Sequence, residues 1–263
     1  MVKETNVASY QVVSKDQFKN LYWKRFGNFH FAANRPVALV VADEMTKLVT
    51  EIPVCFLKQE AGFCAVALLG LKDNSNLFVS PDGAWIGNYV PAVFRVHPFT
   101  LQQTPDGNAV LCVDMDSGLV SDTEGQKFFG VDDAPTEEIT RIANFLSGIE
   151  QQKALTQNLC QQLAELNLLK PWSFSRSPQD KPMLIDNMYQ VDQDALRDID
   201  GEALKSLSAS GALTLAYGQI FSTNNVTRLI ARAEAMTAAQ QTRAKEIAFD
   251  MSEASGTLSF DNL

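Results

Sequence analysis

Between residues 36 and 120 the apolar positions occur in short runs of β-branched and aromatic residues, and turn sequences separate the runs. Runs of this length and composition are typical of buried or half-buried strands. The predicted strands are residues 37–41, 53–57, 63–71, 77–79 and 109–113. Pro81-Asp82-Gly83 and Pro105-Asp106-Gly107-Asn108 predict tight turns, because proline presets φ and glycine accepts a positive φ. Together these features indicate a compact antiparallel sheet or a small barrel.

After Val131 the apolar positions recur with the period of a helix. Asp133 is the expected N-cap of a helix whose first turn holds a proline and two glutamates, which suit the helix dipole. The apolar positions form two stripes, offset around residues 148–153: Ile139, Ile142, Leu146 and Ile149, then Leu155, Leu159, Leu163 and Leu166. One long helix, with or without a kink, and two helices joined end to end both fit this pattern.

The remaining segments complete an α+β fold, in which an antiparallel β-rich half precedes a mostly helical half. Residues 171–182 are loop-like, and residues 183–191 resemble a strand. Helices are predicted over residues 192–200 with 202–208, 212–222 and 226–247. The expected organisation is an N-terminal extension (1–30), a β-rich subdomain (31–131), a helical subdomain packed on it (132–247) and a flexible acidic tail (248–263).

Composition and charge exclude several classes of protein. The 263 residues include 22 Lys+Arg and 31 Asp+Glu, for a net charge of −9, so the basic footprint that nucleic acids or anionic membranes require is missing. The apolar runs are too short to span a bilayer. The polar first residues do not resemble a secretory signal, so we expect a cytoplasmic protein.

The four cysteines are far apart in the sequence and include no Cys-x-x-Cys pair, which argues against a structural zinc site. If residues 58–62 form a hairpin turn, Cys55 lies directly opposite Cys64. A cross-strand disulfide and two buried free thiols are then both possible, and a reducing cytoplasm favours the thiols.

The densest aromatic segment is residues 85–99, and a smaller aromatic patch covers residues 21–31. Alternation through residues 92–96 would place Phe94 on one face of a strand and Arg95 on the other. We hypothesise a wall of stacking and hydrogen-bonding side chains for a small or peptide ligand. Its candidate residues are Trp85, Tyr89, Arg95, His97 and Phe99. The alternative is a set of core aromatics with a surface arginine and a structural histidine.

No known catalytic signature occurs, and no catalytic residue, metal site or cofactor is predicted. Asp114-x-Asp116-Ser117-Gly118 resembles the start of a calcium loop but lacks the later ligands, which indicates a polar turn. Arg228 and Arg232 are one helical turn apart, as in a recognition helix, but the acidic surroundings favour a solvated helix face.

Several short motifs together resemble the SapC-like family of bacterial proteins over about residues 30–233. The strongest block is Gly83-x-Trp85, Tyr89-Val90-Pro91-Ala92-x-x-Arg95 and Pro98-Phe99. Upstream and downstream motifs also fit: Glu51-Ile52-Pro53-Val54-x-Phe56, Leu111-Cys112-Val113-Asp114, Asn167-Leu168-Leu169-x-Pro171, Tyr189-x-Val191-Asp192 and Gly211-Ala212-Leu213. The family is named for a link to a bacterial surface layer, and no catalytic residues are established for it.

The resemblance implies a non-catalytic cytoplasmic binding or accessory protein that assists the modification of a peptide or protein partner. The implied partners are a flavin-dependent halogenase-like enzyme, beside which some family members are encoded, or the substrate of such an enzyme. One alternative is a component of surface-layer or cell-surface assembly. Another is an uncharacterised enzyme that uses His97 with a distant carboxylate such as Asp114.

Overall fold

The computed structural model describes residues 9–174 and 183–255 and confirms the α+β class. A five-stranded antiparallel sheet with the order β10-β11-β4-β5-β3 forms its centre. Its strands are β3 (Val37–Leu39), β4 (Val54–Gln59), β5 (Gly62–Leu68), β10 (Leu169–Phe174) and β11 (Met183–Val191). The central sheet therefore takes strands from both sides of residue 131, because β11 pairs with β4 and β10 pairs with β11 after the long helix.

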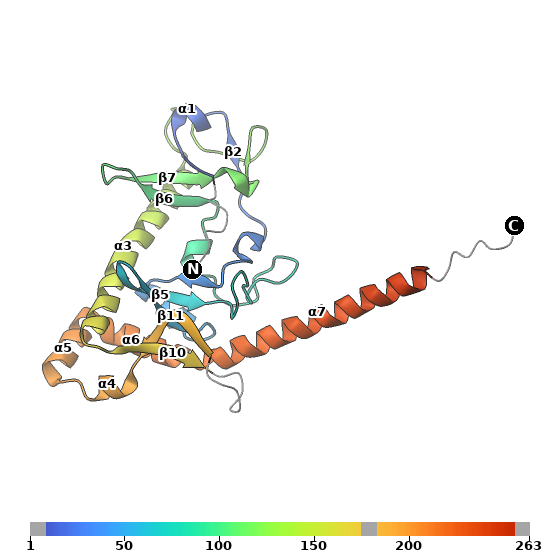
Figure 1. The fold of residues 1–263 in the computed structure, drawn as a ribbon. Helices are drawn as coiled ribbons and strands as arrows, with labels where there is room; N and C mark the ends of the chain where they lie inside the picture. The colour runs from blue at the N-terminus through green and yellow to red at the C-terminus, as the bar shows by residue number, and fades with distance from the viewer. Residues whose placement is uncertain (1–8, 175–182, 256–263) are drawn as a thin grey trace.

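Two smaller antiparallel sheets lie at the other end of the molecule (Figure 1). One has the order β1-β7-β6 and consists of β1 (Tyr10–Val12), β6 (Phe99–Gln103) and β7 (Ala109–Asp114). The other has the order β8-β2-β9 and consists of β2 (Tyr22–Trp23), β8 (Val120–Ser121) and β9 (Gln126–Lys127). The first 30 residues thus supply a strand to each small sheet.

The α-helices are α1 (Lys15–Phe18), α2 (Met45–Leu48), α3 (Glu137–Glu165), α4 (Gln193–Arg197), α5 (Gly201–Ser210), α6 (Ala212–Ser222) and α7 (Asn225–Ser255). Short 3₁₀ helices are η1 (His30–Ala32), η2 (Ala42–Glu44), η3 (Ala92–Phe94) and η4 (Met115–Ser117). Helix α7 projects from the body in Figure 1, and near its start Val226, Leu229 and Ile230 are buried in the main core. None of the helices in the described ranges has both the length and the apolar character that crossing a membrane requires.

Helix α3 is one continuous helix, and it joins two separate hydrophobic cores. Its first half contributes Ile139 and Leu146 to a core around the small sheets. Its second half contributes Cys160 and Leu163 to the main core at the central sheet. The offset between the two apolar stripes of the sequence therefore reflects a change of packing partner rather than a break. In the second stripe, Leu155 is 59% exposed.

Several local predictions are wrong. Thr136, not Asp133, caps α3: its Oγ1 accepts a hydrogen bond from the backbone N of Ile139. Asp133 instead adopts a φ of 61° and forms ion pairs with Lys15 and Lys19. These two lysines are far from Asp133 in the sequence, so no local pattern predicts that they bind its carboxylate.

The hairpin of β4 and β5 has a shorter turn than predicted, so its register differs. Gln59 pairs with Gly62, Leu57 lies opposite Cys64, and Cys55 lies opposite Val66. The predicted pairing of Cys55 with Cys64 is therefore wrong, and both are free thiols. Burial raises the pKa of the Cys55 thiol and that of the Cys64 thiol.

Three further segments differ from the sequence prediction. Residues 92–94 form the 3₁₀ helix η3 instead of an alternating strand, and residues 77–79 contribute one isolated bridge, Val79 to Trp85. The predicted loop from residue 171 begins inside strand β10, and residues 175–182 lie outside the described residues. Helix α7 continues to Ser255, and residues 256–263 of the predicted tail are likewise not described.

The packing of α3 predicts different effects for two leucines that the sequence pattern places in the same stripe. Leu163 is 0% exposed, so Leu163→Ala should lower the free energy of unfolding by about 2–5 kcal/mol. Leu155→Ala is the matched control on the same helix and should change it by less than about 0.5 kcal/mol. Urea denaturation of both variants measures the difference, and equal losses would contradict the assigned helix face.

Candidate ligand-binding pocket

Two buried carboxylates hold the loop of residues 88–92 in place. Glu44, at the end of η2, is 5% exposed, and Glu51 is 9% exposed. Glu51 accepts hydrogen bonds from the backbone N of Asn88 at 3.0 Å and from that of Tyr89 at 2.6 Å, and the Asn88 side-chain amide adds a third at 3.3 Å. A buried carboxylate is stable only when such donors replace its water. The buried carboxylate therefore depends on the N–H donors of the loop, and the loop depends on the carboxylate as their acceptor.

Glu44 anchors the far end of the same loop. Its Oε1 accepts hydrogen bonds from the Tyr89 hydroxyl at 2.8 Å and from the backbone N of Ala92 at 2.7 Å. Its Oε2 accepts one from the backbone N of Val41 at 3.2 Å, which ties the loop to the entrance of η2. Burial and the Glu44 carboxylate raise the pKa of Tyr89 to about 12, so its hydroxyl stays protonated and donates at neutral pH.

Trp85 supports the loop from behind. Its ring stacks on Phe78 with 5.5 Å between centroids, and its Nε1 donates to the backbone O of Tyr89 at 2.9 Å. Gly87 allows this close packing, because a Cβ at that position would lie 2.9 Å from the Trp85 Nε1 and 3.2 Å from the Phe78 ring. The loop therefore leaves little room for any larger residue at position 87.

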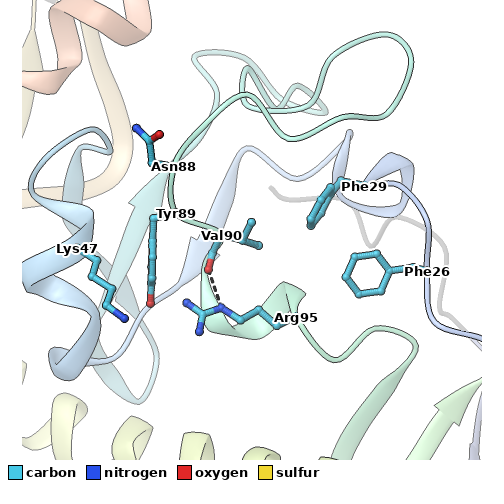
Figure 2. Close-up of a pocket in the computed structure, with 7 residues that line it drawn as sticks. All are labelled: Phe26, Phe29, Lys47, Asn88, Tyr89, Val90 and Arg95. Carbon is cyan, nitrogen blue, oxygen red and sulfur yellow. Dashed lines mark hydrogen bonds between the residues drawn. The ribbon is translucent and has the colours of Figure 1, made fainter.

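The outer side of the loop borders an open pocket with a volume of about 440 Å³. Figure 2 shows its lining residues, which come from three separate parts of the chain: Phe26, Phe29, Lys47, Asn88, Tyr89, Val90 and Arg95. Tyr89 stands between the Lys47 and Arg95 side chains in this view, with Lys47 Nζ 5.6 Å and Arg95 Cζ 4.7 Å from its ring centroid. The Arg95 Nε donates to the backbone O of Val90 at 2.9 Å.

The five residues that the sequence analysis proposed for the site lie in different parts of the structure. Tyr89 and Arg95 line the pocket, whereas Trp85 lies behind the loop. His97 stacks on Phe31, with centroids 3.9 Å apart and an interplanar angle of 11°, and it does not line the pocket. Phe99 is 5% exposed and packs edge-on against Trp23 in the core around the small sheets.

The Asp114 charge favours the protonated form of His97 and so raises its pKa, but no hydrogen bond joins these two described residues. Burial lowers the pKa of His97 to about 4 despite the Asp114 charge, so the imidazole is neutral at pH 7. Asp114 itself caps η4 by accepting from the backbone N of Asp116 at 3.0 Å. The acidic sequence around it thus forms a turn. In the described parts of the chain, no group of three or more His, Cys, Asp or Glu residues is arranged to hold a metal ion.

Arg228 and Arg232, near the start of α7, contact the protein body. Arg228 Nη1 donates to the backbone O of Thr50 at 3.1 Å, and Arg232 Cζ lies 4.1 Å from the centroid of the Phe78 ring. Burial lowers the pKa of Arg232, and the opposite effect of the Glu51 carboxylate is smaller. The start of α7 therefore packs against the same Phe78 ring that supports Trp85.

Sequence reasoning missed five of the lining residues. Phe26 and Phe29 belong to the aromatic patch at residues 21–31, and Asn88 and Val90 lie inside the aromatic block, so a signal existed for these four. Lys47 and Glu44 carry no such signal, and the SapC-like motif that begins at Glu51 does not reveal that this residue is an anchor. They are ordinary charged residues around a short helix until the fold brings residues 88–92 against them.

One family model, SapC, matches residues 13–229. The chain belongs to the SapC family. No curated protein and no solved structure matches it. The SapC match includes every residue that lines the pocket and both anchoring glutamates, and it ends inside α7. The pocket is therefore part of the SapC region of this chain.

Trp85→Ala should destabilise this SapC protein by about 3–5 kcal/mol, because it removes a large packed ring and the hydrogen bond to Tyr89. Ile86→Ala, at a neighbouring residue that is 46% exposed, is the control and should be nearly neutral. Thermal and urea unfolding of the two variants check this. An unchanged midpoint for Trp85→Ala would contradict the supporting role.

The low pKa of His97 predicts that the free energy of unfolding decreases as the pH is lowered. Its pKa is about 4 in the folded protein and 6.5 in the unfolded chain, so the unfolded chain takes up the proton first as the pH falls. This contribution is fully present above pH 6.5 and is lost between pH 6.5 and 4. His97→Asn should therefore show a smaller decrease in unfolding free energy over this range than the wild type. Urea denaturation across this pH range compares the two proteins, and a wild-type slope in His97→Asn would refute the assignment.

Proposed function

We propose that this SapC protein is a non-catalytic accessory protein that binds a peptide or protein partner through the pocket at Tyr89 and Arg95. The observation that carries the proposal is the rigid support of an open, solvent-facing pocket by two buried carboxylates. A pre-organised loop loses little conformational freedom when it binds, which favours affinity.

The lining side chains are of kinds that bind rather than react. Two phenylalanine rings and a valine offer apolar contact, and Asn88, Lys47 and Arg95 offer polar contact. The Tyr89 hydroxyl is protonated and donates to Glu44, so its role in the loop is structural. Apolar surface with a few convergent polar groups is the common composition of a binding site.

The proposed setting follows the family resemblance and the cysteines. Four free thiols support a reducing compartment such as the cytoplasm. There the partner would be a peptide or protein that another enzyme modifies, or that enzyme itself. A flavin-dependent halogenase-like enzyme is the candidate that the resemblance suggests, and the SapC protein would present or hold the substrate for it.

A selection from a displayed library of random peptides tests the proposal. The full-length wild type is the target, and recovered peptides are then measured by titration calorimetry against Arg95→Ala and Arg197→Ala. Arg197 is an exposed arginine on α4 that does not line the pocket, and it serves as the matched control. We expect peptides that bind the wild type with micromolar dissociation constants. Their affinity should fall about tenfold for Arg95→Ala and stay unchanged for Arg197→Ala.

Peptides that bind all three proteins equally would place binding elsewhere and refute the pocket. A library that yields no binder to the wild type would refute peptide recognition by this protein. Circular dichroism and the unfolding midpoint of each variant establish that the fold is intact.

A further inference from the structure

Lys47 and Arg95 are cations without a counter-charge at the surface. Both side chains are exposed, and neither forms an ion pair with any described residue. Some other cations of this acidic chain do so, for example Lys15, Lys19 and Arg25, so Lys47 and Arg95 are distinguished by their shared position at Tyr89. These two cations flank one ring, that of Tyr89, in a chain of net charge −9.

The two nearby carboxylates lie on the inner side of the loop and do not line the open pocket. Glu44 and Glu51 are buried, and their oxygens already accept hydrogen bonds from the backbone of residues 41 and 88–92 and from Tyr89. Their charge faces the inside of the loop, while Lys47 and Arg95 face the open pocket (Figure 2). A ligand that enters from solvent therefore meets the cations first.

The geometry of Arg95 favours a planar anion. Its Nε is engaged with the backbone O of Val90, which restricts the orientation of the guanidinium. The guanidinium also interacts with the Tyr89 side chain, and its two terminal nitrogens match the two oxygens of a carboxylate. Lys47 reaches the same end of Tyr89 from the opposite face and adds a second charge.

The other half of the pocket is apolar. Phe26 and Phe29 pack edge-to-face with centroids 5.2 Å apart, and Val90 lies between them and Tyr89 in Figure 2. A volume of about 440 Å³ suits one or two side chains rather than a long extended segment. The pocket thus offers an apolar contact directly beside a cationic one.

We propose that the pocket binds a peptide carboxylate through Arg95 and Lys47, with a neighbouring aromatic or aliphatic side chain of the peptide against Phe26 and Phe29. This inference rests on the proposed function and specifies its ligand. The carboxylate belongs either to an Asp or Glu side chain or to the C-terminus of the partner. The chemistry is the same in both cases.

Four synthetic peptides separate these possibilities by titration calorimetry with the full chain. Acetyl-Gly-Phe-Glu-Gly-amide and its Gln counterpart test an acidic side chain. Acetyl-Gly-Gly-Phe with a free C-terminus and its amide test a terminal carboxylate. We expect at least one acid to bind about tenfold more tightly than its neutral partner, and more weakly as salt is raised. The tighter of the two acids identifies the source.

Variants connect the preference to the two cations. Arg95→Gln and Lys47→Gln should each reduce the ratio of acid to neutral affinity, whereas Arg197→Gln should preserve it. Arg95→Lys keeps the charge and loses the planar fork, so it should retain part of the preference even if Arg95→Gln folds poorly. Replacing the peptide Phe with Ala should weaken both acids, because the apolar contact is lost.

Equal binding of acid and neutral peptides would overturn the carboxylate inference. So would a failure of all four peptides when library-selected peptides bind in an Arg95-dependent manner. In both cases the proposed binding function stands. If the library also yields no binder, the proposed function itself fails, which makes the two failures distinguishable.

Discussion

The pocket depends on the hydrogen bonds between the loop of residues 88–92 and two glutamates that lie some 40 residues earlier in the chain. Each glutamate is buried, and each would be strongly unfavourable there without its donors, because a buried carboxylate loses its hydration. The backbone amides of the loop in turn lack a sheet or helix partner. The hydrogen bonds between these amides and the glutamates hold Tyr89 in position. The Tyr89 ring in turn lies between the side chains of Lys47 and Arg95.

The rest of the fold holds this pair of segments together. The Trp85 ring fills the space behind the loop and stacks on Phe78, and Arg232 at the start of α7 covers the same Phe78 ring. Helix α3 joins the core of the central sheet to the core of the small sheets. Phe26 and Phe29 follow β2, which belongs to one of the small sheets, so the apolar half of the pocket depends on that connection.

The local signals of the sequence were most reliable where a short-range rule decides the structure. Helix α6 has the predicted bounds, and Gly211 separates it from α5 with a φ of 93°. The turn at residues 105–107 joins β6 and β7 as the proline and glycine predict.

The wrong predictions concern side chains and strand partners that other segments of the chain determine. Asp133 was predicted to cap α3, but Lys15 and Lys19 bind its carboxylate. The turn between β4 and β5 is also shorter than the predicted residues 58–62, which changed the partner of Cys55 from Cys64 to Val66.

By itself the sequence determined the α+β class, the order of the main elements, the SapC membership and the aromatic block that contains Tyr89 and Arg95. These follow from periodicity, turn residues and short motifs, which are local properties. Only the tertiary structure decided that His97 and Phe99 pack away from the pocket and that Phe26, Phe29 and Lys47 line it. It also decided that Glu44 and Glu51 serve as anchors. The reason is physical: a carboxylate acquires this role from burial and from donors on another segment, and both exist only after the chain has folded.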